Sequence, residues 1–205
     1  MRFSRFAAAA AIAGLVLVAA VAAQQAPAGG GQRGAGGPPA PPPMRLTSTS
    51  FPDGAQIPVK YTQAGAQVSP ALTWTNAPPN TQSFVLHMHD MEGARNRTTE
   101  DQLHWLVWNI PSSTTSLPEG VPQGPDLKDG SHQTSATGNG IYRGPGAPAA
   151  GPLHHYVFEI FALDIKPDIV ANAAEPFDTR AKVLSAMQGH VIGKAVYMGL
   201  FHRPE

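Results

Sequence analysis

Ionisable side chains stand at one end of three apolar, aromatic-rich segments of this chain. The segments are 84–90, 103–111 and 153–163. Asp90 ends the first of them, and His104 and His154 each stand second in the other two. The segments are typical of buried β-strands, and burying a polar group without a partner costs roughly 2–7 kcal/mol. We therefore expect the three side chains to meet one another, or a ligand, in a polar pocket at the rim of a β-sandwich core.

The two-residue period of a strand indicates which way these side chains point. Asp90 and His154 are in phase with apolar residues of their own segments. His104 is in phase with Leu106 and Trp108. All three ionisable groups are therefore predicted to continue rows of side chains that pack into the core.

Hydrophobic patterning predicts an all-β fold with one significant helix near the C-terminus. Strands are expected at 46–51, 57–61, 71–74, 84–89, 104–110, 156–163 and 191–201. The first two flank a turn at Pro52-Asp53-Gly54. Three of these segments, 84–89, 104–110 and 156–163, are apolar on both faces, which is typical of central strands covered on both sides.

The expected helix begins with Asp178 as its cap, runs to about Gln188, and ends at Gly189. Two rows of side chains are candidates for its buried face: Ala181, Leu184, Ser185 and Gln188, or Val183 and Met187.

The N-terminal part of the chain has the features of a targeting segment. Arg2 and Arg5 precede an apolar stretch over 6–23, and small residues there predict cleavage before Gln24. The alternative is an uncleaved membrane anchor, because the stretch just reaches a length that spans a bilayer. The predicted organisation is a signal peptide at 1–23, a Gly- and Pro-rich linker at 24–45 and a folded domain at 46–205. The mature protein is expected to be periplasmic or secreted.

The zero net charge of the whole chain hides an acidic domain. Four of the 14 basic residues precede residue 46: Arg2, Arg5, Arg33 and Arg45. All 14 acidic residues follow it, so the domain holds 10 basic and 14 acidic residues and a formal charge of −4. Nucleic-acid binding is not expected, and membrane contact is expected only in transit through the signal peptide. The chain has no cysteine, so core packing must provide the stability that disulfides give many exported proteins.

Several motifs in one register resemble the phosphatidylethanolamine-binding protein family, specifically its bacterial Raf-kinase-inhibitor-like branch. The motifs lie at 57–62, 68–74, 104–111, 144–148, 153–156 and 187–192. The resemblance covers residues 46–203 and implies a sandwich of two antiparallel sheets with a small anion-binding cavity. In this chain the sandwich would carry a C-terminal helix followed by a final strand.

Carried over position by position, the resemblance implies a cavity lined by Asp90, His104, Gly146, Pro148, His154 and Tyr156. Glu92 completes the predicted ligand-binding set. It belongs to Asp90-Met91-Glu92-Gly93-Ala94, which stands where relatives carry Asp-Pro-Asp-Ala-Pro. This segment keeps the first acid and the charge of the second but lacks both prolines. We therefore expect a looser loop and a wider pocket mouth.

The chemistry of this set favours a small anion. A nearby carboxylate stabilises the protonated form of a histidine, so His104 and His154 beside Asp90 are expected to offer cationic N–H donors. The Tyr156 hydroxyl and the Gly146 backbone N–H would complete an anion cradle. The sequence thus predicts an exported, non-catalytic domain that binds phosphate or a phosphorylated headgroup.

Specific residues bear on other classes of function. An inhibitor or regulator of a protease or other envelope enzyme, acting through protein contact, stays open as the alternative. Hydrolysis is disfavoured, because the chain has neither a Gly-x-Ser-x-Gly motif nor a cysteine nucleophile. A single metal centre is disfavoured as well, because His87 and His89 share a strand face that points away from Asp90. No metal and no cofactor are therefore expected.

Overall fold

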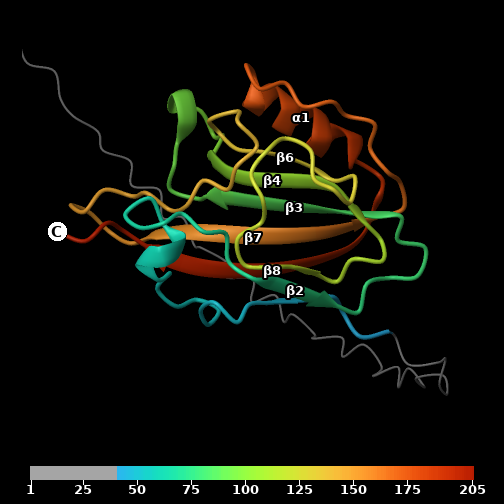
Figure 1. The fold of residues 1–205 in the computed structure, drawn as a ribbon, viewed down its shortest axis with the longest axis horizontal. Coiled ribbons are helices and arrows are strands. Elements are labelled where there is room, and N and C mark those ends of the chain that lie inside the picture. Colours follow the sequence, from blue (N-terminus) through green and yellow to red (C-terminus); the bar gives the residue numbers. More distant parts are fainter. Residues whose placement is uncertain (1–40) are drawn as a thin grey trace, which may run out of the picture. The chain divides into compact units, whose positions relative to one another are not determined.

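The computed structural model describes residues 41–205. The predicted signal peptide and residues 24–40 of the predicted linker lie outside the described residues. Two antiparallel sheets form the fold, in agreement with the predicted class. The larger sheet has the order β6-β4-β3-β7-β8 and can be followed in Figure 1. Its strands are β3 (Ser83–Asp90), β4 (Gln102–Pro111), β6 (His132–Thr134), β7 (His154–Leu163) and β8 (Val191–Phe201).

The smaller sheet covers one face of the larger one. Its order is β1-β2-β5, with strands β1 (Arg45–Thr47), β2 (Leu72–Thr75) and β5 (Ser116–Leu117). The two sheets share one apolar core, in which Trp74 of the small sheet packs edge-on against Phe84 of β3 at 5.4 Å between ring centroids. Interdigitating apolar side chains between two sheets are the main source of stability in a sandwich.

Helix α1 (Pro176–Ala186) covers the opposite face of the larger sheet. Its buried row contains Val183 and Met187, which pack with Leu106 and Trp108 of β4. Of the two candidate rows, the structure therefore selects the second. Because the larger sheet is covered on both sides, every residue of the central strand β3 is buried, as its apolar sequence predicted.

The helix boundaries differ from those expected. The helix begins at Pro176 and not at Asp178. Proline is favourable at the first helical position, because the backbone N–H that it lacks would have no partner within the helix at that point. Asp178 therefore lies inside the first turn, where its carboxylate pairs with Lys182 at 2.8 Å instead of capping the helix. After the helix the chain turns at Gly189, whose φ of +82° suits glycine.

The predicted strand at 57–61 is wrong. Val59–Tyr61 forms the 3₁₀ helix η1, in which the Tyr61 N–H donates to the Pro58 carbonyl at 2.9 Å. Proline at 58 has no N–H to give to a sheet ladder, so a strand is disfavoured at this point. A second 3₁₀ helix, η2 (Arg95–Arg97), lies between β3 and β4. Within residues 41–205, no helix has both the length and the apolar character needed to cross a membrane.

Candidate functional site

Six of the seven predicted ligand-binding residues line one cavity of about 170 Å³ at the edge of the sandwich core. They are Asp90, His104, Gly146, Pro148, His154 and Tyr156. Larger hollows occur on the described surface, among them one of about 540 Å³ whose lining is mostly proline and apolar residues. The smaller cavity is distinguished by its chemistry, since its lining includes a carboxylate residue, two histidines, an arginine and a tyrosine.

Antiparallel pairing places Asp90 and Tyr156 side by side. They are register partners on β3 and β7, and His154 precedes Tyr156 by the two residues that keep a side chain on the same face. The Nδ1 atom of His154 lies 2.9 and 3.1 Å from the two carboxylate oxygens of Asp90. A carboxylate can only accept, so this nitrogen carries the proton and Nε2 is the free ring atom.

His104 reaches the cavity for a reason that strand phase did not predict. Trp105 pairs with Met88 and Leu103 pairs with His89, which leaves His104 as an extra residue without a partner on β3. This β-bulge takes His104 out of phase with its neighbours along the strand. Leu106 and Trp108, with which it was expected to align, pack under α1. The His104 ring instead meets the Tyr156 ring edge-on at 5.0 Å.

The predicted cationic role of His104 is wrong. Its Nδ1–H donates to the Arg143 carbonyl at 2.8 Å. Burial lowers the pKa of His104 to about 4, because water no longer stabilises the imidazolium. The side chain is therefore neutral near pH 7, and its Nε2 is a hydrogen-bond acceptor.

Tyr156 organises the loop that closes the cavity. Its hydroxyl oxygen accepts the N–H groups of Gly146 at 3.1 Å and Ala147 at 3.0 Å. The Gly146 N–H is therefore not free for an anion, contrary to the expected cradle. Burial, together with the nearby Asp90 charge, raises the pKa of Tyr156 to about 12, so the hydroxyl keeps its own proton as a donor.

Glycine at 146 permits a close approach from the other side of the loop. An added Cβ at this position would lie 2.3 Å from the amide nitrogen of Gln63, which itself donates to the Gly144 carbonyl at 2.8 Å. The loop 144–148 is thus held between the Gln63 amide and the Tyr156 hydroxyl.

Glu92, the seventh predicted residue, does not line the cavity. Its two oxygens accept the His155 backbone N–H at 2.7 Å and the His155 Nδ1–H at 2.6 Å. The Glu92 N–H in turn donates to the Asp90 carboxylate at 3.0 Å. Glu92 therefore ties the loop after β3 to the start of β7. Its carboxylate also lies near the Asp90 carboxylate and the His154 imidazole. One ligand atom from each of the three residues lies within 4.8 Å of the others, a grouping that would suit a cation.

Four further lining residues were not predicted: Gln63, Gln102, Arg143 and Ala147. Arg143 directly precedes the Gly144-Pro145-Gly146 motif. This position beside a predicted cavity loop was the one sequence feature that could have indicated Arg143 as a lining residue. Gln102 pairs with Asp90 across the bulge and so shares its face, which only the register reveals. Arg143 brings a guanidinium, the side chain best suited to hold phosphate oxygens in pairs.

Comparisons with known proteins give one consistent result. Residues 47–202 match the family model described as phosphatidylethanolamine-binding protein. A UPF0098 protein of Methanothermobacter thermautotrophicus is 37% identical over 161 residues, which cover 78% of this chain and 99% of the relative. A UPF0098 protein of Aquifex aeolicus is 33% identical over 160 residues, covering 78% and 89%.

Solved structures agree with the sequence comparisons. A putative phosphatidylethanolamine-binding protein homologue from Chlamydia trachomatis superposes with a TM-score of 0.66 at 30% identity, covering 78% of this chain and 98% of that chain. The Escherichia coli protein YbcL, described as a member of the mammalian family, gives a TM-score of 0.60 at 23% identity with the same coverage. The second likeness concerns the fold alone.

Proposed function

Because the chain belongs to the phosphatidylethanolamine-binding protein family, we propose that its cavity binds a small anion, either phosphate or a phosphorylated headgroup, and does so without catalysis. We place this activity in the exported form of the chain. The family name suggests a phosphorylated headgroup as the ligand. The donors and the positive charge in the cavity explain why that ligand would be an anion.

One observation carries the proposal: the Asp90–His154 pair and Arg143 line the same cavity. The Arg143 charge lies near enough to add to the effect of burial in lowering the pKa of His104. Asp90 accepts the His154 Nδ1–H and leaves Nε2 as the free ring atom. In the imidazolium form of the ring, which a bound anion favours, Nε2 would donate to a ligand oxygen. Arg143 adds fixed positive charge, which a phosphoryl group can bind through two oxygens. The Tyr156 hydroxyl adds a neutral donor.

The acceptors in the cavity narrow the class of anion. Neutral His104 presents Nε2 as an acceptor, and the Asp90 carboxylate can accept as well. A ligand that also carries a donor, such as a protonated phosphate or the ammonium of phosphoethanolamine, would satisfy them. Sulfate carries no proton near neutral pH, so the His104 and Asp90 acceptors would face its negative charge without a hydrogen bond. We therefore propose that phosphate species are preferred to sulfate.

A binding role without turnover is consistent with the state of these groups. The Tyr156 hydroxyl holds its proton firmly, since burial raises its pKa to about 12, so it is a poor nucleophile near pH 7. His104 uses one ring nitrogen on a backbone carbonyl. The cavity thus presents groups that position an anion, in keeping with a family of binding proteins.

Calorimetric titration of the full chain at pH 6 tests the proposal with phosphate, O-phosphoethanolamine and sulfate. We expect saturable heats for the first two and a weaker response to sulfate. Arg143→Gln should weaken phosphate affinity about tenfold or more, because a hydrogen bond to a charged group is worth about 1.5–3 kcal/mol. Lys166→Gln removes an exposed charge beyond the far end of β7 and is the matched control.

Two results would overturn the proposal. One is the absence of any saturable heat with millimolar phosphate or O-phosphoethanolamine. The other is equal phosphate affinity for the wild type and Arg143→Gln. Titration with vesicles that contain phosphatidylethanolamine separates the two sources of the headgroup, because a lipid ligand requires binding to the vesicles as well as to the free compound.

A further inference from the structure

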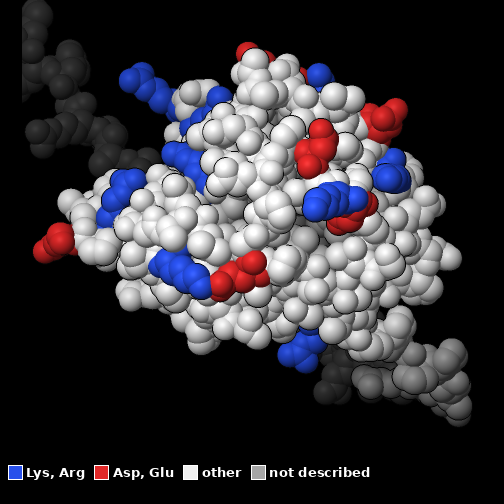
Figure 2. Space-filling view, viewed as in Figure 1, with Lys and Arg blue, Asp and Glu red and all other residues white. Residues whose placement is uncertain are grey.

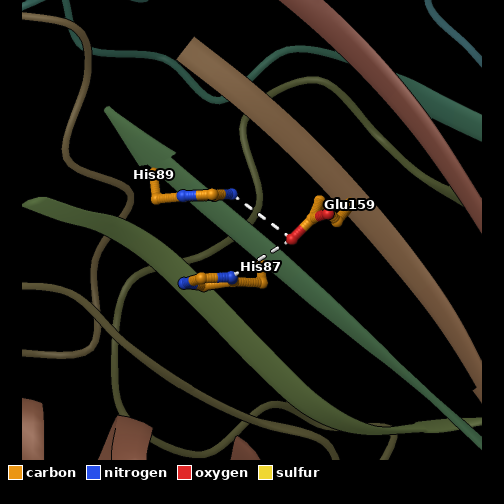
Figure 3. A group of neighbouring side chains, drawn as sticks. All are labelled: His87, His89 and Glu159. Atoms are coloured by element: carbon orange, nitrogen blue, oxygen red, sulfur yellow. Dashed lines mark ion pairs between the residues drawn. The ribbon is translucent and has the colours of Figure 1, made fainter. Parts of the chain in front are cut away.

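A second polar cluster lies on the face of the larger sheet opposite the cavity. His87 and His89 alternate along β3 with Met88 and Asp90, so they point toward the side covered by α1. Glu159 of β7 is the register partner of His87. Figure 3 shows both imidazoles directing a ring nitrogen at the same carboxylate. The anion cavity uses none of these three side chains.

The separations in this cluster match those between ligands of one small ion. His89 Nε2 lies 3.3 Å and His87 Nδ1 lies 3.6 Å from the same oxygen, Oε2 of Glu159. Two ligand atoms that are each 2.0–2.1 Å from a tetrahedral zinc ion lie about 3.3 Å apart. The three ligand atoms are also mutually within 4.8 Å. The three ligand atoms are therefore grouped closely enough to hold one ion after a small side-chain adjustment.

The groups that would coordinate the ion are buried and incompletely satisfied. His87 and His89 are 3% and 7% exposed. Among residues 41–205, Nε2 of each ring has no hydrogen-bond partner. The His89 Nε2 faces the Glu159 carboxylate, whereas His87 directs Nδ1 at that carboxylate and its Nε2 is the other ring nitrogen. A buried polar atom without a partner is rare in native proteins and calls for an explanation such as an ion.

A second layer of contacts orients His89 in the way that metal sites usually require. The Asp101 carboxylate accepts the Nδ1–H of His89, which leaves Nε2 as the atom directed at Glu159. Arg180 of α1 holds Asp101 through its carboxylate at 2.5 Å and its backbone carbonyl at 3.0 Å. A carboxylate behind a histidine fixes the tautomer and the direction of the ligating nitrogen.

We propose that His87, His89 and Glu159 form a binding site for a divalent late first-row transition metal such as Zn²⁺. Two imidazoles and one carboxylate are ligands that zinc accepts, and three protein ligands leave a fourth position for water. Glu159 also pairs with Lys194, which is about half exposed and marks the side from which an ion would enter.

Metal binding requires two local adjustments. The imidazole rings are stacked, with centroids 4.3 Å apart and planes 8° apart, so one ring must turn for both lone pairs to reach a common ion. His87 can turn without breaking a hydrogen bond of its Nε2. The ion must also displace a proton: burial disfavours the imidazolium, but Asp101 and Glu159 outweigh it and raise the pKa of His89 to about 9.

The sequence alone did not suggest this site. Strand phase directs His87 and His89 away from Asp90, so the sequence disfavours one metal centre shared by the two faces. The separation of the two faces is correct. Glu159 was overlooked because it lies 70 positions further along the chain and joins the histidines only through the β3–β7 pairing.

Titration of chelator-treated full-length protein with Zn²⁺, followed by calorimetry, tests the proposal. We expect an ion bound by these residues that millimolar Mg²⁺ does not displace, since Mg²⁺ prefers oxygen ligands. His87→Leu and Glu159→Gln should each weaken it at least about 100-fold, because even the loss of an outer contact costs about 10–100-fold. His190→Ala, which removes a half-exposed histidine paired with Asp164, is the matched control and should bind as the wild type does.

Co²⁺ supplies an independent readout on the unmodified chain, since a tetrahedral site gives strong visible absorption bands. The proposal fails if the wild type binds no Zn²⁺ at 100 µM, or if Co²⁺ gives only the weak bands of an octahedral ion. It also fails if folded His87→Leu and Glu159→Gln keep wild-type affinity while His154→Ala loses the ion, which would assign the metal to the anion cavity. Glu159→Gln retains side-chain volume, so it serves if His87→Leu does not fold.

Discussion

A single inserted residue determines where His104 points. Strict alternation along β4 would have placed this imidazole under α1, whereas the bulge at Leu103–Trp105 turns it into the cavity beside Tyr156. Nothing in the local sequence marks the insertion, because the bulge is a property of two paired strands. The family resemblance located His104 correctly, and the phase argument reached the same cavity for the wrong reason.

The buried position of His104 makes a pH dependence testable. Burial holds its pKa at about 4 in the folded chain, below the value of about 6.5 for an unfolded histidine. Between pH 6.5 and 4 the unfolded chain therefore binds a proton that the folded chain does not. The stabilising contribution is fully present above this window and is lost as the pH falls through it.

We expect His104→Gln, which cannot titrate in this range, to remove up to about 3 kcal/mol of that pH dependence. Urea unfolding of the wild type and the variant from pH 7.5 to 4.5 measures it. His190→Gln at the surface is the control and should follow the wild type. His87, whose pKa burial also lowers to about 4, contributes in the same window and remains in every variant. Parallel curves for wild type and His104→Gln would contradict the assignment.

At the scale of elements, the loop 91–101 is held by ion pairs at both ends. Glu92 binds His155 at its start, and Asp101 binds His89 and Arg180 at its end. The prolines of the family pattern are absent, and a looser loop was expected from that loss. The structure offers charged contacts in their place, with the Glu92 N–H also fixing the Asp90 carboxylate.

This arrangement predicts that a substitution at Glu92 lowers phosphate affinity more than it lowers the stability of the fold. Glu92→Gln keeps the size of the side chain but weakens its contacts with His155, so Asp90 and the cavity mouth become less well ordered. We expect phosphate affinity to fall about two- to fivefold and the free energy of unfolding to change by less than about 1 kcal/mol, because partly exposed ion pairs contribute little. Calorimetry and urea unfolding of the same preparation measure both. Glu100→Gln, on an exposed pair with Arg95, is the control.

An unchanged affinity in Glu92→Gln would show that the loop is positioned by its backbone alone. A large loss of stability would show that Glu92 supports the fold and not only the cavity. Either result would contradict the role assigned to this contact.

The way in which each strand or helix is stabilised explains whether the sequence predicted it. Strands β3, β4, β7 and β8 carry long apolar runs, and their existence was evident from composition. In the small sheet, β1 and β2 overlap the predicted segments 46–51 and 71–74, whereas β5 has two residues, too few for a periodic signal. The 3₁₀ helix η1 depends on Pro58 and not on hydrophobicity. The start of α1 was misplaced because Asp178 resembles a cap, whereas Pro176 begins the helix.

At the scale of the whole molecule, one central strand supplies polar groups to two separate faces. The small sheet covers one face of β3 and α1 covers the other, so alternate residues meet different surroundings. Asp90 belongs to the cavity, while His87 and His89 belong to the cluster with Glu159. Two sites can therefore share a strand and remain chemically independent, which is why substitutions at His87 and Arg143 test different proposals.

Charge over the whole domain also bears on how an anion is captured. Figure 2 shows basic and acidic side chains on the same face, some of them in contact, with wide uncharged areas between these groups. The segment 46–205 carries a formal charge of −4, so long-range attraction of an anion is not expected. The contacts inside the cavity must provide the affinity, and its salt dependence should accordingly be modest.

The last prediction concerns the part of the chain that precedes the described residues. Arg2 and Arg5 followed by the apolar stretch 6–23 predict export, with the mature chain beginning near Gln24. N-terminal sequencing of the protein recovered from the periplasm or medium of a bacterial host should give Gln24 as the first residue. Replacing Ala23 with a bulky residue such as phenylalanine should block cleavage, because the peptidase reads small residues at that position. Intact Met1 in the membrane fraction of the wild type would favour the anchored alternative, and the cavity would then act at a membrane surface.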